Sequence, residues 1–191
     1  MDLRWRRIQY GLNWLTNDSD FRLASINGTP AEIENALLEF ETSIRGSDLF
    51  VLDLNGNIIT STLKGLPSGQ AFPYAKALKM ARRNAQTMLV GVLDGRPYMM
   101  VQSAVMAPLP VVGVVSAMPM DDVFAHELRS LSNLEVSFMT LNNGVDGVLS
   151  STQPDAMNAS IVAFMHTHAP GLTVHFSEFQ HQRFLGQLLQ L

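Results

Sequence analysis

The sequence predicts an α+β fold in which a long N-terminal helical segment precedes two small modules built on antiparallel strands. The first observation is a repeat: residues 56–62 and 147–152 are similar, lie about ninety positions apart, and each follow an apolar run and a polar turn. The second is the pair of dipeptides Asn55-Gly56 and Asp94-Gly95, which mark tight hairpins because these residues tolerate positive φ. Together they indicate two modules near the lower end of domain size rather than one large domain.

Composition excludes several classes of protein. Hydrophobic residues make up 47% of the chain and charged residues 16%, which supplies material for two cores and excludes a disordered chain. The formal net charge of −4 argues against nucleic-acid binding, and the basic run at residues 4–7 fits a solvated helix face. The chain has no cysteine, so disulfides, thiolate catalysis and cysteine metal sites are excluded.

Membrane and targeting signals are not found in the sequence. It has neither a signal-peptide pattern nor an apolar run of the roughly eighteen residues that a membrane helix needs. The first residues already have helical spacing, and residues 187–191 carry no stop signal. Taken alone, the sequence therefore predicts a soluble chain or a piece of a larger protein.

Residues 1–47 are expected to form a helical stalk. Its first helix has apolar residues at helical spacing and is interrupted at the polar residues 17–20. A second helix begins at Thr29, because a Thr followed three residues later by Glu32 forms a capping box. Gly46 is expected to end this helix.

The first module is expected to span residues 48–120, with a hairpin, a helix and then three antiparallel strands. The expected elements are strands at 48–54 and 58–62, a loop at 63–72, a helix at 73–84, and strands at 86–93, 98–106 and 111–118. The loop is indicated by its Gly and Pro residues, and the strands by apolar runs between turn signals.

The second module is expected to repeat this order over residues 134–191. A linking helix at 121–133 precedes it, capped by Asp121 or Asp122. The expected elements are strands at 134–141 and 147–151, a helix at 155–168, and strands at 172–176 and 183–191. The second module therefore lacks a fifth strand.

This order of elements resembles a known family. A five-stranded antiparallel sheet with a helix between its second and third strands is similar to the PAS topology. Two such PAS-like modules behind a long helix resemble the double Cache sensory domains of bacterial transmembrane receptors. The resemblance covers nearly the whole chain and is carried by hairpins at 52–61 and 93–98, the run at 107–115, and the segments 118–122 and 131–138.

The resemblance implies a place and an architecture for the chain. Domains of this family lie outside the cytoplasmic membrane, between two transmembrane helices, in front of histidine kinases, adenylate cyclases or diguanylate cyclases (GGDEF, sometimes with EAL). The resemblance also implies that the first module holds the ligand and that two copies pair through the N-terminal helix. In a PAS-like sheet the last strand lies in the middle, so the second module is expected to be incomplete or to pair its edges differently.

No assembled active site is visible in the sequence. His166, His168, His175 and His181 are close in sequence, but the first two are two apart on a predicted helix and point to different faces, so no metal site is expected. The pair Asp121-Asp122 fits a helix cap better than acid–base catalysis. No phosphate-binding loop, dinucleotide-binding glycine pattern or zinc-protease motif is present, and no cofactor is expected.

A ligand site is the better hypothesis. Alternation along the strand from Tyr98 places Tyr98 and Gln102 on the same sheet face, where their polar tips can converge on a small polar ligand between apolar walls. Asp121 follows the last strand of the module and is placed to approach a cationic group such as a ligand amine. The alternative for Tyr98 is that its hydroxyl is satisfied locally and the face is ordinary core. Tyr98, Gln102 and Asp121 are therefore the candidate ligand-binding residues.

The function expected from these observations is sensing. The chain is predicted to be a non-enzymatic, periplasmic or otherwise extracytoplasmic domain of a membrane-anchored signal-transduction protein. It would bind an unknown small molecule and control a diguanylate cyclase, phosphodiesterase or histidine kinase output. A cytoplasmic PAS-type dimerisation or cofactor-binding module is the alternative, and a hydrolytic enzyme is the third class.

Overall fold

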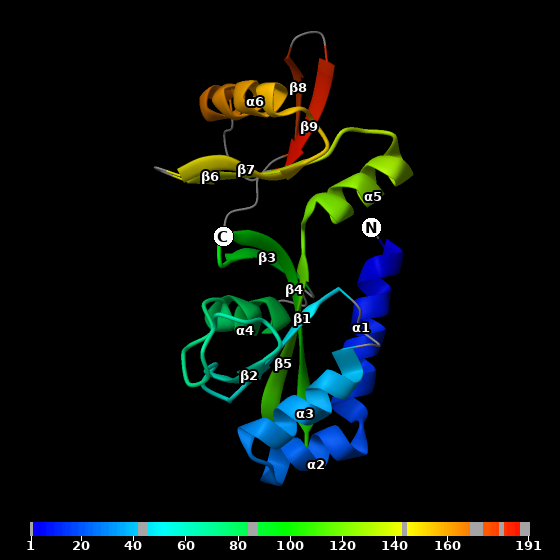
Figure 1. Cartoon of the computed structure of the whole chain (residues 1–191), viewed down its shortest axis with the longest axis vertical. Helices are drawn as coiled ribbons and strands as arrows, with labels where there is room; N and C mark the ends of the chain where they lie inside the picture. Colours follow the sequence, from blue (N-terminus) through cyan, green and yellow to red (C-terminus); the bar gives the residue numbers. More distant parts are fainter. Residues whose placement is uncertain are drawn as a thin grey trace. The chain divides into compact units, whose positions relative to one another are not determined.

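The computed structural model describes residues 2–41, 46–83, 88–142, 145–168, 174–179 and 182–187. The chain divides into two compact units (Figure 1), and each is described by itself. The first comprises Met1–Asp94 and Tyr98–Pro119, and the second comprises Gly95–Pro97 and Met120–Leu191. None of the described helices has both the length and the apolar character needed to cross a membrane.

Three helices open the chain: α1 (Asp2–Asn17), α2 (Ser19–Asn27) and α3 (Pro30–Glu41). The break predicted at residues 17–20 is confirmed, because the Asp18 carboxylate accepts hydrogen bonds from the backbone N–H of Asp20 and Phe21 and starts a new helix. The predicted capping box is also confirmed: the Thr29 backbone N–H donates to the Glu32 carboxylate at 2.7 Å, which lowers the Glu32 pKa. The end of α3 predicted at Gly46 adjoins residues 42–45, which lie outside the described residues.

The first unit is built on a five-stranded sheet in the order β2-β1-β5-β4-β3. Its strands are β1 (Asp48–Leu52), β2 (Ile58–Ser61), β3 (Leu89–Leu93), β4 (Arg96–Met106) and β5 (Pro110–Pro119). The central strand β5 pairs antiparallel with both β1 and β4. The predicted α+β fold with a five-stranded antiparallel sheet is confirmed.

The two faces of this sheet are covered by different helices. Figure 1 shows α1, α2 and α3 on one side and α4 (Ala75–Arg83) on the other. On the first side, the Thr16 hydroxyl of α1 lies 3.3 Å from the Ser103 hydroxyl of β4. Because side chains alternate between the two faces of a strand, Gln102 points to the other face, which α4 covers. The alternation predicted from the sequence also placed Gln102 and Ser103 on opposite faces.

The α4 side of the sheet holds a continuous apolar core. Phe50 and Phe72 pack there with ring centroids 5.0 Å apart. The buried members of the cluster are Phe50, Leu52, Ile58, Phe72, Ala75, Leu78, Leu93, Tyr98, Met100, Val115 and Ala117. Burial of this many apolar side chains is the main source of stability in the unit.

The turn between β1 and β2 is closed by a side chain and by a glycine. The Asp53 carboxylate accepts hydrogen bonds from the backbone N–H of Asn55, the backbone N–H of Asn57 and the Asn57 amide, each at 2.8 Å. Burial works to raise the pKa of Asp53, but the hydrogen bonds from Asn57, Gly56 and Asn55 outweigh it and lower the pKa below its ordinary value. Gly56 has φ +94°, and a Cβ at this position would lie 2.5 Å from the Ala75 Cβ at the start of α4. The predicted hairpin is confirmed, with strand β1 ending at Leu52 because the turn begins at Asp53.

The Tyr74 side chain, just before α4, hydrogen-bonds to the backbone of the edge strand β3. The Tyr74 hydroxyl accepts a hydrogen bond from the Val92 backbone N–H at 2.8 Å and donates one to the Val92 carbonyl at 3.0 Å. Backbone groups on a sheet edge that no strand pairs are a template for unwanted association. Tyr74 therefore ties the start of α4 to the sheet and covers this part of the edge.

The second unit carries α5 (Asp122–Ser132), α6 (Asp155–His168) and four described strands. The strands are β6 (Ser137–Asn142), β7 (Val145–Ser151), β8 (Val174–Phe179) and β9 (Gln182–Gln187). They form two separate antiparallel ladders, β6-β7 and β8-β9. These ladders correspond to β1-β2 and β3-β4, which β5 joins in the first unit. The predicted ends at residues 172–173 and 188–191 lie outside the described residues.

The two units close their first hairpins in the same way. In the first, the Thr62 hydroxyl accepts from the Leu49 backbone N–H at 2.9 Å, and the Thr62 N–H donates to the Leu49 carbonyl at 2.9 Å. In the second, Thr152 makes both contacts with Val136, at 2.8 and 2.9 Å. The threonine that ends each copy of the sequence repeat thus has an identical local role.

We expect Gly56→Ala to destabilise the protein by about 3 kcal/mol. Positive φ is unfavourable for alanine, and the added Cβ would overlap with the Ala75 side chain. The matched control is Gly65→Ala, where φ is +107° and no atom lies within 4 Å of an added Cβ. This control should lose only about 1 kcal/mol. Denaturant unfolding measures both, and equal losses would show that the contact with Ala75 costs nothing.

We expect the Asp53 carboxylate to make stability depend on pH. Because its folded-state pKa is lowered, its contribution is present above the unfolded-state pKa of about 3.9 and is lost as pH falls through the folded-state pKa. Asp53→Asn should cost about 1 kcal/mol at pH 6, and this difference from wild type should shrink as the pH falls through the folded-state pKa of Asp53. Urea unfolding across this range measures it, and a difference that does not change with pH would contradict the assignment.

Candidate ligand-binding site

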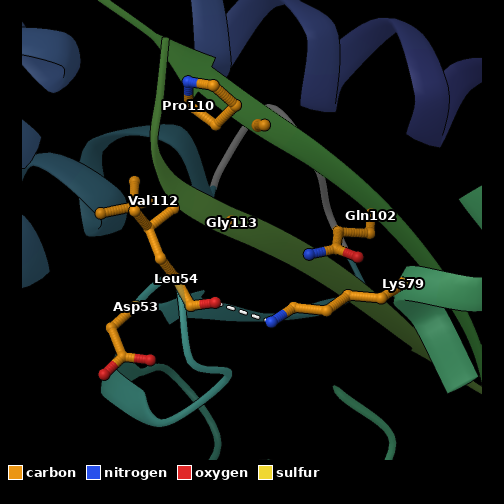
Figure 2. A pocket seen from close by; sticks show the side chains of 8 residues that line it. Asp53, Leu54, Lys79, Gln102, Pro110, Val112 and Gly113 are labelled. Atoms are coloured by element: carbon orange, nitrogen blue, oxygen red, sulfur yellow. Dashed lines mark hydrogen bonds between the residues drawn. The ribbon is translucent and has the colours of Figure 1, made fainter. Parts of the chain in front are cut away.

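A pocket of about 470 Å³ lies within the first unit, between the end of β1, the helix α4 and the strands β4 and β5 (Figure 2). This volume is in the range of small-molecule sites. The pocket is lined by Asp53, Leu54, Lys79, Gln102, Ala104, Pro110, Val112 and Gly113. Its described wall is mostly apolar and has three polar side chains, which come from the β1–β2 turn, from α4 and from β4.

Gln102 presents its side-chain amide to this pocket from the middle of β4. Its Nε2 lies 2.6 Å from the position where a Gly113 Cβ would be, so the amide occupies space that only glycine leaves open. Its Oε1 is buried and has no hydrogen-bond partner within the described part of the chain. An unpaired buried carbonyl costs about 1–3 kcal/mol, and a ligand or water that donates a hydrogen bond removes this cost.

Lys79 reaches the pocket from α4. Its Nζ donates a hydrogen bond to the Leu54 carbonyl at 2.6 Å, drawn as a dashed line in Figure 2. Among the described residues, no carboxylate lies within ion-pair distance of this ammonium group. Lys79 therefore brings a positive charge to the pocket. Its hydrogen-bond partner there is the neutral Leu54 carbonyl.

Asp53 lines the pocket, but its carboxylate is used elsewhere. Figure 2 shows the carboxylate directed toward the β1–β2 turn and not toward the Lys79 ammonium group. Its three hydrogen bonds from the turn, two of them from Asn57, account for this orientation. Asp53 therefore shapes the pocket mainly by holding the turn that carries Leu54.

The structure separates the three candidate residues predicted from the sequence. Gln102 lines the pocket, as expected for a ligand contact. Tyr98 is on the same sheet face but is only 2% exposed and packs in the apolar cluster with Met100, which fits the alternative of ordinary core. Asp121 belongs to the second unit, does not line this pocket, and caps α5 by accepting from the Phe124 backbone N–H at 2.9 Å. Contacts of Tyr98 and Asp121 with a ligand stay predictions.

Sequence reasoning missed Lys79 and Gly113. The isolated glycine inside the apolar run of β5 was a usable signal, because such a residue often marks close approach of another group. Lys79 carried no signal, because its position depends on how α4 packs against the sheet.

The other titratable side chains are the groups that could bind a metal ion. In the described part of the chain, no group of three or more His, Asp or Glu side chains is placed to hold one. The Asp122 carboxylate accepts from the Ser150 hydroxyl at 2.8 Å, so the Asp121-Asp122 pair serves structure within the second unit. The side chains of His166, His168 and His175 and the whole of His181 lie outside what the structure describes.

Comparison with known proteins gives results only at the level of structure. No protein-family model matches the chain, and no curated protein is similar to it. An extracellular ligand binding receptor from Desulfohalobium retbaense has a TM-score of 0.56 at 12% identity. That match covers 98% of this chain, which spans only 35% of the receptor.

Two structures of one chemoreceptor are similar as well. The ligand-binding domain of Campylobacter jejuni Tlp3 in complex with 4-methylisoleucine gives a TM-score of 0.51 at 13% identity, over 95% of this chain and 75% of that one. The sensory domain of the same receptor gives 0.51 at 14% identity, over 95% and 78%.

These identities show a shared fold. The resemblance to Cache sensory domains predicted from the hairpins and the strand order is therefore confirmed for the fold. The chain has the α+β architecture of extracellular ligand-binding domains of receptors.

Proposed function

We propose that the chain is the extracytoplasmic ligand-sensing domain of a membrane-anchored bacterial receptor and binds a small molecule in its first unit. The observation that carries this proposal is the pocket at the end of the sheet, where the buried Gln102 Oε1 lacks a partner and the Lys79 ammonium group lacks a counter-ion among the described residues. Groups in this state gain most from a ligand that supplies the missing contacts.

The similar structures suggest where a ligand search begins. The Tlp3 ligand-binding domain was solved with 4-methylisoleucine, a branched amino acid. The pocket of this chain has apolar walls from Leu54, Pro110 and Val112, which suit a small branched side group. Amino acids and their close analogues therefore head the list of ligands to test.

Signalling would be a population shift between two arrangements of the domain. A ligand shifts the equilibrium only if it binds one arrangement more tightly. Two of the elements that line the pocket suit this role: α4 contacts the β1–β2 turn, and β5 starts at the pocket and ends at Pro119, directly before the second unit. The output would be a cyclase, phosphodiesterase or kinase domain elsewhere in the parent protein, and this segment itself would not be catalytic.

A ligand screen tests the proposal. A ligand at a hundred times its Kd adds about 2.7 kcal/mol of stability, which corresponds to a rise in Tm of roughly 5–10 °C for a chain of this length. Ala104→Trp should fill the pocket and abolish the rise, whereas Val123→Trp, at an exposed position of α5, should leave it unchanged. The proposal fails if no small molecule of a broad metabolite panel shifts Tm, or if Ala104→Trp has no effect on a ligand that does.

We also propose that two copies pair through α1. Tyr10 and Trp14 are four residues apart on this helix, so they share one face, and they are 72% and 59% exposed. Trp14 is held in place by an edge-to-face contact with Phe40 of α3, at 5.0 Å between ring centroids. Large ordered aromatic side chains on a helix surface are typical of the centre of an interface.

The double variant Tyr10→Ser/Trp14→Ser should therefore shift the chain from dimer to monomer, with at least a tenfold weaker dimer. Leu23→Ser is the control, because Leu23 lies on α2 and is also 59% exposed. Sedimentation velocity over a concentration series measures both. A monomeric wild-type protein, or equal weakening by the two changes, would contradict pairing through α1.

A further inference from the structure

We infer that the pocket selects a small organic acid whose second polar group is a neutral hydrogen-bond donor, such as a hydroxyl or an amide, in preference to an amino acid. Lys79 would bind the carboxylate and Gln102 the neutral donor. This inference rests on the proposed function, because it names the ligand class of the same pocket.

The charge of the ligand follows from Lys79. Its Nζ is bonded to the Leu54 carbonyl, and the described part of the chain offers it no carboxylate. The present bond joins the ammonium group to a neutral carbonyl, and a carboxylate in its place would add the attraction between two opposite charges. A ligand carboxylate would therefore displace or share the bond to the Leu54 carbonyl. A neutral acceptor would gain only a weaker bond to Lys79, and a cationic ligand would be repelled.

The neutral donor follows from Gln102. The buried Oε1 accepts no hydrogen bond from the described residues, and Nε2 lies against Gly113, where a Cβ would be only 2.6 Å away. Rotation of the amide by 180° exchanges its oxygen and nitrogen, so Gln102 can present its acceptor to a ligand on either side. A hydroxyl or amide N–H on the ligand pairs with this acceptor without adding charge.

The preference against an ammonium group follows from Asp53. Among the lining residues that the structure describes, only Asp53 supplies a carboxylate, and its oxygens already accept three hydrogen bonds from the turn. Three of its roughly four acceptor positions are therefore occupied. An ammonium group would be desolvated beside a neutral amide and the Lys79 charge, which is costly.

The remaining walls set the shape of the ligand. Leu54, Ala104, Pro110 and Val112 supply apolar surface, so the carbon skeleton between the two polar groups would be small and apolar. A branched 2-hydroxy acid meets all of these conditions, and the amino acid with the same skeleton differs from it only in the charged amine.

Calorimetric titration of the whole chain with matched ligands tests the inference. The set is a branched 2-hydroxy acid (2-hydroxy-4-methylpentanoate), the amino acid with the same skeleton (leucine), the acid without a 2-substituent (4-methylpentanoate) and the methyl ester of the hydroxy acid. We expect the hydroxy acid to bind at least tenfold more tightly than each of the other three.

Three variants separate the contributions. Lys79→Gln should weaken the hydroxy acid at least tenfold, whereas Lys76→Gln, an exposed lysine on the same helix that does not line the pocket, should leave its Kd unchanged. Gln102→Leu should abolish the difference between the hydroxy acid and the unsubstituted acid. Gly113→Ala should weaken the hydroxy acid by moving the amide while keeping every charge.

The outcomes are distinguishable from those of the proposed function. Binding of leucine as tight as that of the hydroxy acid, or loss of affinity by the same factor in Lys79→Gln and Lys76→Gln, would overturn the inference and leave a small-molecule sensor. Absence of binding by all four ligands would also overturn the inference. The proposed function falls only if the broad metabolite panel fails as well.

Discussion

The close approach of Gly56 to Ala75 is the constraint on which the first unit depends. Because Gly56 has no Cβ, the start of α4 can lie directly against the β1–β2 turn. Lys79, one helical turn after Ala75, then reaches the Leu54 carbonyl within the β1–β2 turn. The Asp53 carboxylate holds the same turn from within. The close approach of Gly56 to Ala75 thus fixes the position of the β1–β2 turn relative to α4, and both line the pocket.

The two units share their first hairpin but differ in how the sheet is completed. Thr62 and Thr152 make the same pair of backbone contacts, which gives the sequence repeat a physical meaning. In the first unit β5 joins the outer strand pairs and supplies Pro110, Val112 and Gly113 to the pocket. The described strands of the second unit remain in two ladders. The pocket of the first unit depends on this central strand, because three of its lining residues come from β5.

Most of the fold could be predicted from the sequence because its signals are local. The capping box at Thr29, the break at Asp18 and the Asn55-Gly56 turn depend on neighbours within a few residues, and each was confirmed. The site depends on long-range packing and was predicted only in part. Alternation along β4 placed Gln102 and Tyr98 on one sheet face. It could not show how this face packs, and in the structure Gln102 lines the pocket whereas Tyr98 lies in the apolar core. Lys79 contributes through a contact with Leu54, which is distant in sequence, and no single-sequence pattern reveals it. Gly113 is marked in the sequence only as an isolated glycine in an apolar run, and its closeness to Gln102 depends on the packing of the sheet.

The proposed function requires a small molecule to bind in the first unit, against the side chains of Lys79 and Gln102. Its most direct test is a two-dimensional NMR titration that follows the side-chain amide of Gln102 together with the backbone amides of Leu54 and Gly113. We expect the ligand found by the screen to shift these signals with a midpoint at its calorimetric Kd. Shifts confined to residues of the second unit, with the Gln102 amide unchanged at saturation, would contradict it.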